Sequence, residues 1–383
     1  MPLFLSDTLS AARKALPEGP IKMYVCGVTP YDTTHLGHAF TFVHFDTLVR
    51  AMRWLMPDRQ VTYVQNVTDI DDSILARARK LQVGWRSLGD EQTEQYLADM
   101  HALNVAPPTH LVRATTAIPT MLDIISRLVD RGVAYAVEGA SVFFRVRSVP
   151  TYGELCKFSR ERMLEIASQQ DEPDVDDPRK EDPLDFALWK GWSGQSDEPC
   201  WDSPWGRGRP GWHIECSALC YQYLGEQLTL HGGGADLVFP HHENEIAQSE
   251  TALQKRPFAH IWSHVAMVRM DGEKMSKSLG NMVFVRDLLR TYSSDAIRLY
   301  LLRHHYRQVW EWSTPEMKDA GRLAQRLATA AREPDIASGL ERETFAAALG
   351  DDLDTPRAIE IMSSISGGTL REFAAVLGLT LTD

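Results

Sequence analysis

The chain has 383 residues, of which 44% are hydrophobic and 24% are charged. This composition is typical of a globular protein with a substantial core, and it excludes a fibre or a disordered tail. The 40 Lys and Arg residues against 52 Asp and Glu residues give a net charge of −12. Such a charge disfavours broad attraction to nucleic acid but leaves room for a local basic surface. The sequence shows neither a bilayer-length apolar run nor a signal-peptide pattern, which predicts a cytoplasmic protein that does not engage a membrane.

The first third of the chain has the pattern of a parallel α/β sheet. Residues 21–26 predict a short buried strand, and a turn then leads into a helix that extends to Met52. A second strand is predicted at 61–66, followed by a helix from about Ile74. Alternating strands and helices of this kind form parallel sheets covered by helices.

The middle of the chain predicts an insertion between two halves of one catalytic domain. Residues 90–135 have helical spacing, and 142–146 predict a strand. The segment 171–210 is first acidic and Pro-rich, then Trp-rich. The sheet is expected to resume near 228–231, and the chain is expected to be helical beyond about 285.

The first motif with chemistry is His35-Leu36-Gly37-His38, at the predicted start of a helix. Helix N-termini present N–H groups that lack a partner within the helix, so they can bind phosphate, and two imidazoles one turn apart add further donors. Taken alone, the motif fits two surface histidines equally well.

The second motif is Lys274-Met275-Ser276-Lys277-Ser278, in a stretch flanked by Gly and Ser. Two lysines three residues apart can close over a polyphosphate and stabilise a departing pyrophosphate. A solvated basic loop is the simpler explanation for this motif alone. The occurrence of both motifs, in this order, with the sheet pattern predicts a shared nucleotide site.

Four further stretches complete the pattern: 23–27, 63–72, 208–216 and 239–245. With the two motifs, they resemble the class I aminoacyl-tRNA synthetases and, among these, the members that activate cysteine. The resemblance covers nearly the whole chain. It implies an α/β fold with a Rossmann-like catalytic domain, an inserted α+β subdomain and a C-terminal helical domain. The expected ranges are 1–95 for the first half of the catalytic domain, 96–205 for the insertion, 206–285 for the second half with the lysine motif, and 286–383 for the helical domain.

Five cysteines are too few and too scattered for a disulfide framework, so reduced or metal-binding thiols are expected. Cys26 ends the first strand, Cys216 lies far along the chain, and His241 and Glu245 are four residues apart, which gives a candidate zinc set. Each of them alone fits an ordinary buried side chain, and the resemblance is what supports the set. Glu245 is the least certain ligand because it could instead support the others from outside the coordination sphere. Cys220 is expected to be a packing residue.

The resemblance also implies which residues bind the substrates. It places the adenylate against Gly27, Val28, Thr29, Gly37, Thr41, Asn66, Val67, Thr68, Gly234, Ala235, Asp236 and Val268. It places the cysteine against Thr29, Thr68 and Trp212. The cysteine carboxylate would attack the α-phosphate of ATP, while His35, His38, Lys274 and Lys277 stabilise the developing charge. Mg²⁺ is expected with ATP, and Zn²⁺ is expected to bind the substrate thiolate.

The acceptor of the activated cysteine is less clearly indicated. Two kinds of relative share the activation step: cysteinyl-tRNA synthetases, and mycothiol-pathway ligases that form an amide with glucosaminyl-inositol. The short stretch after Ser278, the Thr29-Pro30 turn and residues 351–356 favour the ligase. Residues 182–190 and 243–250 favour the synthetase, as does the absence of the ligase's Glu-Arg-Gly-Gly-Asp-Pro signature.

The sequence-based hypothesis is therefore a monomeric ligase that joins cysteine to glucosaminyl-inositol. A shortened synthetase acting on tRNA(Cys) is the first alternative, and a ligase for another amine is the second. A catalytically silent paralogue that binds RNA is the alternative from a different functional class. The intact motifs and the metal set argue against it, because a binding module has no use for a site that releases pyrophosphate.

Overall fold

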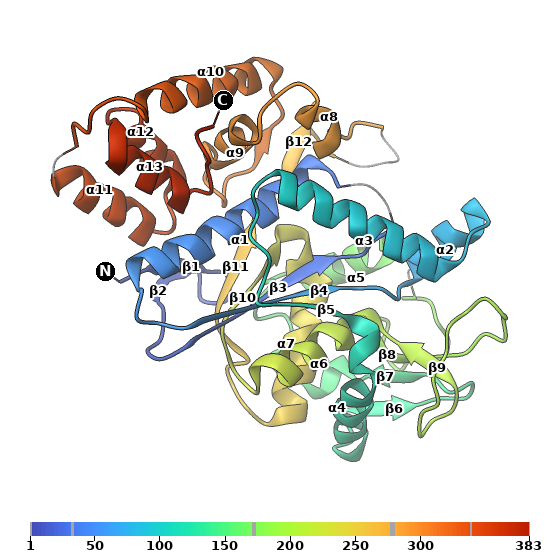
Figure 1. Cartoon of the computed structure of the whole chain (residues 1–383). Coiled ribbons are helices and arrows are strands. Elements are labelled where there is room, and N and C mark those ends of the chain that lie inside the picture. The colour runs from blue at the N-terminus through green and yellow to red at the C-terminus, as the bar shows by residue number, and fades with distance from the viewer. Residues whose placement is uncertain (1, 32–33, 171–173, 276–279, 338, 383) are drawn as a thin grey trace.

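A computed structural model describes residues 2–31, 34–170, 174–275, 280–337 and 339–382. At its centre lies a five-stranded parallel sheet in the order β11-β10-β3-β4-β5 (Figure 1). Its strands are β3 (Ile21–Val28), β4 (Val61–Val67), β5 (His110–Arg113), β10 (Leu228–Gly234) and β11 (Ala259–Val265). Chain order reverses at β3, since β4 lies on one side of it and β10 on the other. In open parallel sheets, such a reversal leaves a crevice at the carboxyl ends of the strands.

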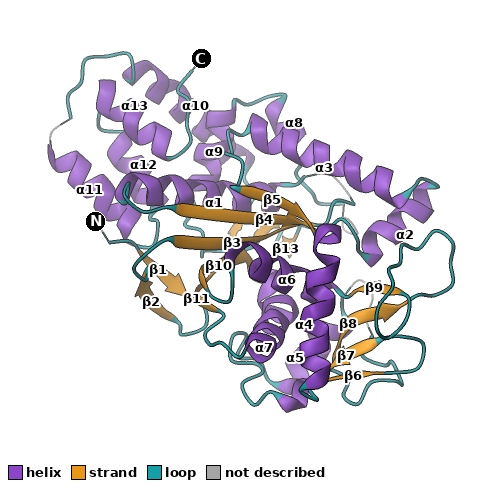
Figure 2. Cartoon of the chain, turned by 60° about the horizontal axis from the view of Figure 1, so that its bottom comes forward, coloured by secondary structure: helices purple, strands orange, loops and turns teal. Residues whose placement is uncertain are grey.

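Both faces of the sheet are covered, and most residues along its central strands are buried. Met23 and Val25 of β3 belong to one hydrophobic cluster, whereas Tyr24 and Cys26, which alternate with them, belong to another. The first cluster includes α1 (Leu36–Leu55) and α3 (Trp85–Ala102), and the second includes α4 (Ile118–Asp130), α6 (Trp212–Leu224) and α7 (Glu243–Leu253). Figure 2 shows the sheet between these two layers of helices.

The insertion is built around a four-stranded antiparallel sheet in the order β6-β7-β8-β9. Its elements are β6 (Ala134–Ala136), β7 (Val142–Phe144), β8 (Phe186–Gly191), β9 (Gly208–Pro210), η2 (Val146–Ser148) and α5 (Arg160–Ser168). The predicted strand at 142–146 is thus confirmed, two residues shorter than expected.

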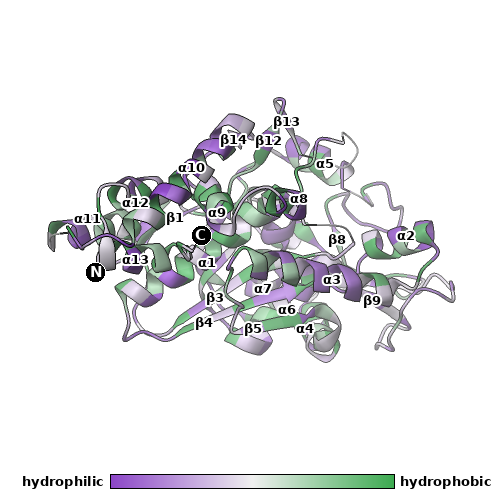
Figure 3. Ribbon diagram, turned by 45° about the horizontal axis from the view of Figure 1, so that its top comes forward, coloured by the Kyte–Doolittle hydropathy of each residue, from purple (hydrophilic) through white to green (hydrophobic). Residues whose placement is uncertain are grey.

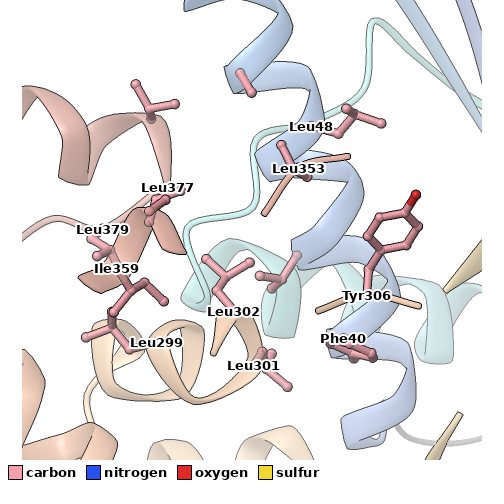
Figure 4. Packing of buried hydrophobic residues seen from close by; sticks show 14 of the residues in the cluster. Phe40, Leu48, Leu299, Leu301, Leu302, Tyr306, Leu353, Ile359, Leu377 and Leu379 are labelled. Atoms are coloured by element: carbon pink, nitrogen blue, oxygen red, sulfur yellow. The ribbon is translucent and has the colours of Figure 1, made fainter. Parts of the chain in front are cut away.

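The C-terminal region is helical and packs against α1. It comprises α8 (Val285–Leu289), α9 (Ser294–Leu302), α10 (Thr314–Ala330), α11 (Gly339–Gly350), α12 (Thr355–Met362) and α13 (Gly367–Val376). Figure 4 shows leucines of this region, such as Leu299, Leu302 and Leu377, gathered against Phe40 and Leu48 of α1. Among the described residues, none of the helices combines the length and apolar character that crossing a membrane requires.

The remaining elements are short. They are β1 (Phe4–Asp7), β2 (Ala12–Ala15), α2 (Asp72–Leu81), η1 (Ala114–Ala117), η3 (Ala235–Leu237), η4 (Val238–His242), β12 (Val268–Met270), β13 (Glu273–Lys274) and β14 (Trp310–Glu311). β12 pairs with both β13 and β14, so it ties the segment before the lysine motif to the C-terminal helices.

The structure differs from the sequence-based expectation at two strands. Residues 90–135 are not helical throughout, because β5 at 110–113 pairs with β4 and so becomes the edge of the central sheet. β11 was not expected at all. The expected limit at residue 95 falls inside α3, and the central sheet continues beyond it with β5. The expected limit at residue 205 falls before β9, which is a strand of the insertion. The proposed domain limits remain predictions.

A buried arginine joins α1, α9 and the C-terminal segment. The guanidinium of Arg298 is fully buried, donates to Asp46 Oδ2 of α1 at 2.7 Å, and donates to the carbonyls of Leu103 and Leu377 at 3.0 Å. Asp46 also accepts from Arg50. Burial makes this pair costly to break, because without Arg298 the buried Asp46 would keep only the less buried Arg50 as its charged partner.

We expect the substitution Arg298→Met to lower the free energy of unfolding by about 3–5 kcal/mol, since Asp46 loses its buried partner. Urea unfolding followed by circular dichroism measures the change. Arg357→Met is the control, because Arg357 makes an exposed pair with Glu360 and its loss should cost no more than about 0.5 kcal/mol. Equal effects of the two substitutions would contradict the role of the buried pair.

Candidate active site

A cavity of about 860 Å³ lies at the carboxyl ends of the central strands. It extends from the start of α1 to the insertion, which contributes Tyr152, Lys180 and Lys190 to its wall. Residues expected from the sequence line much of it: Cys26, Gly27, Val28, Thr29, His35, Gly37, His38, Thr41, Asn66, Thr68, Trp212, Cys216, Gly234, Asp236, His241 and Val268. Val67, Ala235 and Glu245 are not among the lining residues, and the side chains of Val67 and Glu245 are buried.

The start of α1 faces this cavity and is capped by a histidine. His35 Nδ1 accepts from the backbone N–H groups of Gly37 at 3.1 Å and His38 at 3.4 Å. Because Nδ1 accepts, the neutral ring carries its proton on Nε2, where it can be donated. The rings of His35 and His38 stack with their centroids 3.8 Å apart, so the motif places two imidazoles together at the helix N-terminus.

The chain that follows the lysine motif is hydrogen-bonded to this helix start. The N–H of Leu36 donates to the carbonyl of Val283 at 2.8 Å, and the N–H of Val285 donates to that of Thr34 at 3.2 Å. The backbone of Lys274 forms part of β13, whereas Lys277 lies outside the described residues. The two motifs are therefore neighbours through the segment 283–285, and the positions of the lysine side chains stay predictions.

The ends of β3 and β4 are joined by a side-chain amide. Asn66 Oδ1 accepts from the N–H of Gly27 at 2.8 Å, and Asn66 Nδ2 donates to Thr68 Oγ1 at 3.0 Å. A Cβ at Gly27 would lie 1.7 Å from the Asn66 carbonyl oxygen, so no larger residue fits without a backbone shift. This contact keeps the backbone of both strand ends close together at the cavity wall.

The four predicted metal ligands come together at the base of the cavity. Cys26 lies near the end of β3, Cys216 lies on α6, His241 precedes α7 and Glu245 is in the first turn of α7. Their ligand atoms lie within 4.8 Å of one another, and all four side chains are buried. Cys26 Sγ is 3.7 Å from Cys216 Sγ and 3.4 Å from Glu245 Oε1.

These distances test whether a zinc ion fits. Ligands at zinc–sulfur and zinc–nitrogen distances of about 2.0–2.3 Å in a tetrahedron are separated by roughly 3.3–3.8 Å. Both contacts of Cys26 fall in this range, whereas His241 Nε2 and Glu245 Oε1 are 2.7 Å apart, a hydrogen-bond distance. The two thiols and the imidazole suit zinc directly. Glu245 fits either as a ligand after a small displacement or as the hydrogen-bond partner of His241.

Histidines that the sequence analysis did not single out surround this cluster. His231 Nε2 is 2.6 Å from Glu245 Oε2, and His242 Nε2 is 3.3 Å from Cys26 Sγ. His242 Nδ1 contacts His264 Nε2 at 2.7 Å, and His213 Nδ1 contacts His241 Nδ1 at 3.0 Å. The sequence did hold one signal for these contacts, the consecutive histidines His241 and His242. The side chains of neighbouring residues point in different directions, so a second histidine beside a candidate ligand was a candidate contact on another side of the cluster.

A family model described as "tRNA synthetases class I (C) catalytic domain" matches residues 12–322. The chain belongs to this family.

Several named proteins are similar over nearly the whole of this chain and over most of their own length. The cysteine–tRNA ligase of Symbiobacterium thermophilum is 42% identical, over 95% of this chain and 84% of its own length. The cysteine–tRNA ligase of Paramagnetospirillum magneticum is 46% identical, over 96% of this chain and 79% of its own length. The L-cysteine:1D-myo-inositol 2-amino-2-deoxy-alpha-D-glucopyranoside ligase of Thermobispora bispora is 42% identical, over 95% of this chain and 89% of its own length.

Solved structures agree on the fold. The methionyl-tRNA synthetase of Mycobacterium tuberculosis, in complex with methionyl-adenylate, superposes with a TM-score of 0.62 at 16% identity and covers 94% of this chain and 83% of its own. The expected α/β fold with a parallel sheet and a helical C-terminal region is confirmed.

In this family member the cluster at the cavity base is highly polar. Burial opposes ionisation of Cys216, but the hydrogen bond from Cys26 and the proximity of His241 lower the pKa of Cys216 to about 6. Burial also lowers the pKa of His241, yet Glu245 and Cys216 raise it to about 10. The pKa of Glu245 is well below its usual value because His231 and His241 outweigh the effect of burial. The thiolate of Cys216 and the carboxylate of Glu245 carry two negative charges, and a bound metal ion would take the place of the proton on His241.

The insertion is attached to the helix that carries Glu245. The buried carboxylate of Glu243 accepts from the N–H groups of Gly153 at 2.7 Å and of Leu155 and Cys156 at 3.0 Å. The hydroxyl of Tyr152 donates to Asn244 Oδ1 at 2.6 Å. The start of α7, and with it the cluster of Cys26, Cys216, His241 and Glu245, is thereby held from the insertion side. Sequence reasoning missed this contact because nothing in a lone glutamate indicates three distant backbone donors.

Trp212 closes another side of the cluster. Its ring stacks on His241 with centroids 4.3 Å apart, and both residues line the cavity. Trp212 is the first residue of α6, after Gly211, where a Cβ would lie 1.9 Å from the Ala187 carbonyl oxygen. The tight backbone contact brings the indole beside this cluster.

We expect Cys216→Ala to lose bound zinc, whereas Cys220→Ala should retain about one ion per chain. Both thiols are buried on α6 one turn apart, but only Cys216 belongs to a group that could hold a metal. Elemental analysis of the purified, dialysed variants measures the difference. Full zinc content in Cys216→Ala would remove this residue from the ligand set.

Proposed function

We propose that this protein activates L-cysteine with ATP to form cysteinyl adenylate, and that it transfers the cysteinyl group to the 3′ end of a tRNA. The observation that carries the proposal is the buried group of Cys26, Cys216, His241 and Glu245 at the base of a cavity whose mouth holds the histidine motif. Membership of the class I family accounts for the nucleotide half of the reaction. The thiol-rich base accounts for the choice of amino acid.

The chemistry of the cluster favours a thiol substrate. Cys26, Cys216, His241 and, directly or through His241, Glu245 would hold zinc, which supplies affinity for a thiolate over a hydroxyl. Trp212 and Thr68 also line the cavity and would enclose the short side chain. Serine has the same shape as cysteine, but its hydroxyl is a poorer and far less acidic ligand, so the site would exclude it.

The strand ends and α1 would position ATP for attack. The cysteine carboxylate oxygen forms a bond to the α-phosphorus while the bond from that phosphorus to the bridging oxygen of pyrophosphate breaks. His35 and His38 sit at the helix N-terminus, where N–H donors and the helix dipole stabilise phosphate charge. Lys274 and Lys277 would stabilise the leaving pyrophosphate, and Mg²⁺ would supply further positive charge beside it. Asp236 would accept hydrogen bonds from the ribose, and Val268 would contact adenine.

The transfer step requires no nucleophile from the protein. A terminal hydroxyl of the tRNA attacks the acyl carbon of the adenylate, an ester bond forms, and AMP leaves with the electrons of the broken acyl–phosphate bond. The proton of the hydroxyl passes to the released phosphate or to solvent.

The names of the relatives favour tRNA as the acceptor over glucosaminyl-inositol, which the sequence alone had favoured. Cysteine–tRNA ligases are similar at 42–46% identity. A second candidate function remains amide formation with an amino sugar, because the Thermobispora bispora ligase is equally similar at 42% and its sequence is covered over 89% of its length.

Cysteine-dependent exchange of pyrophosphate into ATP tests the activation step. We expect exchange with cysteine and none with serine at equal concentration. Exchange with both amino acids would contradict the thiol-selective site, and exchange with neither would overturn the proposed function.

A competition between acceptors tests the transfer step in the same preparation. Deacylated tRNA and glucosaminyl-inositol are offered together with radioactive cysteine and ATP, and the products are separated by acid precipitation and chromatography. Charged tRNA without amide is the expected outcome. Amide without charged tRNA would replace tRNA with the amino sugar as acceptor.

A further inference from the structure

Two cationic side chains of the insertion lie directly opposite each other on neighbouring strands. Lys190 of β8 and Arg209 of β9 are partners in the antiparallel register of this strand pair. Like charges at such positions repel each other unless an anion lies between them. That anion is Asp72, the first residue of α2, which contacts the Lys190 ammonium through Oδ2 and the Arg209 guanidinium through Oδ1. The two cations are therefore held together by a residue outside the insertion.

A second carboxylate holds Arg209 from another side. Arg209 Nε donates to Glu198 Oε1 at 3.0 Å, and Glu198 Oε2 accepts from the N–H of Ser193 at 2.9 Å. The side chains of Asp72, Glu198 and Arg209 are all 13% exposed or less. Burial opposes ionisation of Asp72, but Lys190 and Arg209 lower the pKa of this carboxyl below its usual value. These four residues, Asp72, Lys190, Glu198 and Arg209, are called the ionic bridge below.

One end of the ionic bridge is close to a wall of the cavity. Arg209 precedes Trp212 by only three residues, and Trp212 lines the cavity and stacks on His241. The backbone between them is tightly held, because the N–H of Gly211 donates to the carbonyl of Leu188 at 2.9 Å. A displacement of Arg209 would therefore be transmitted to the indole.

The other end is close to the opposite wall, which includes Thr68. Asp72 follows Thr68 by four residues, and the segment between them is also fixed. Asp69 accepts from the N–H of Thr115 at 2.9 Å and from its hydroxyl at 2.6 Å, and the side chain of Asp71 caps α2. Figures 2 and 3 show α2 at the same end of the molecule as β8 and β9. The ionic bridge thus joins the two parts of the chain that carry Thr68 and Trp212.

We infer that Arg209 is a positioning residue that sets how long an amino-acid side chain the cavity accepts. The inference rests on the proposed function and deepens it. A metal ion at the base would select a thiol, but it would not by itself distinguish cysteine from homocysteine, whose thiol is one methylene farther from the carboxylate. That distinction requires a fixed separation between Thr68, Trp212 and the ligand cluster. Arg209 is not among the residues that line the cavity, so it would act through Asp72 and through the backbone before Trp212.

Pyrophosphate exchange with cysteine, homocysteine and serine tests the inference on the full-length protein. The test variant is Arg209→Met, which keeps an unbranched apolar side chain and removes both charged contacts. The control variant is Arg79→Met. Arg79 of α2 pairs with Asp197 at 2.8 Å, so it joins the same helix to the same loop of the insertion, but at exposed positions. Circular dichroism verifies that each variant is folded.

We expect Arg209→Met to raise KM for cysteine about tenfold. The ratio of kcat/KM for homocysteine to kcat/KM for cysteine should rise at least about tenfold, since one methylene in a fitted pocket is worth about 10–200-fold. KM for ATP should change by less than about twofold, and serine should still give no exchange, because the ligand cluster is intact. Arg79→Met should leave the ratio within about twofold of the unmodified protein. The ratio does not depend on the fraction of active protein, so partial unfolding alone would not change it.

Arg209→Lys is the second variant, because an ammonium lacks the fork of N–H groups that contacts both carboxylates at once. We expect its ratio to lie between those of the unmodified protein and Arg209→Met. An unchanged ratio in every folded Arg209 variant, or an equal rise in Arg79→Met, would overturn the inference and leave cysteine activation standing. Absence of exchange with cysteine in the unmodified protein would instead overturn the proposed function itself.

Discussion

The structure depends on a group of buried polar atoms that come from three separate parts of the chain. The thiols of Cys26 and Cys216 and the side chains of His241 and Glu245 are almost completely removed from water. Such groups are costly to bury unless each contacts another or a shared ion. The backbone around them follows from this constraint. β3, α6 and the start of α7 must meet at one point, and the reversal of strand order at β3 is what brings them there.

The same constraint explains the histidines that lie behind the cluster. His231 and His242 contact Glu245 and Cys26, and His264 contacts His242 in turn. Outer contacts of this kind fix the orientation of ligating side chains and the ring nitrogen that carries each proton. The cavity in front of the cluster can then be wide and open to substrates, while its base stays rigid.

Much of this arrangement could be predicted from the sequence, for reasons that differ between elements. The strands at 21–26, 61–66 and 228–231 were predicted because these short segments consist mainly of apolar, aromatic and β-branched residues. β5 was missed because it is a four-residue edge strand, and its pairing with β4 cannot be seen in its own residues. The ligand set was predicted from residue type and resemblance, and the structure brings its members together. Their role as zinc ligands stays a prediction, as do the roles of Lys274 and Lys277. The contact of Glu243 with three backbone N–H groups was beyond sequence reasoning, because backbone donors carry no residue signature.

The Glu243 contact has a consequence for how such a protein could be modified. An inserted subdomain joined to its host only by two chain connections could be exchanged for another of similar length. Here the insertion supplies the three N–H groups that satisfy a buried carboxylate two residues from Glu245. A transplanted insertion would have to reproduce the backbone path of residues 153–156 as well as the lengths of its ends. The segment that looks most like an accessory is therefore a structural part of the host domain, and chimeras should keep it together with α7 as one unit.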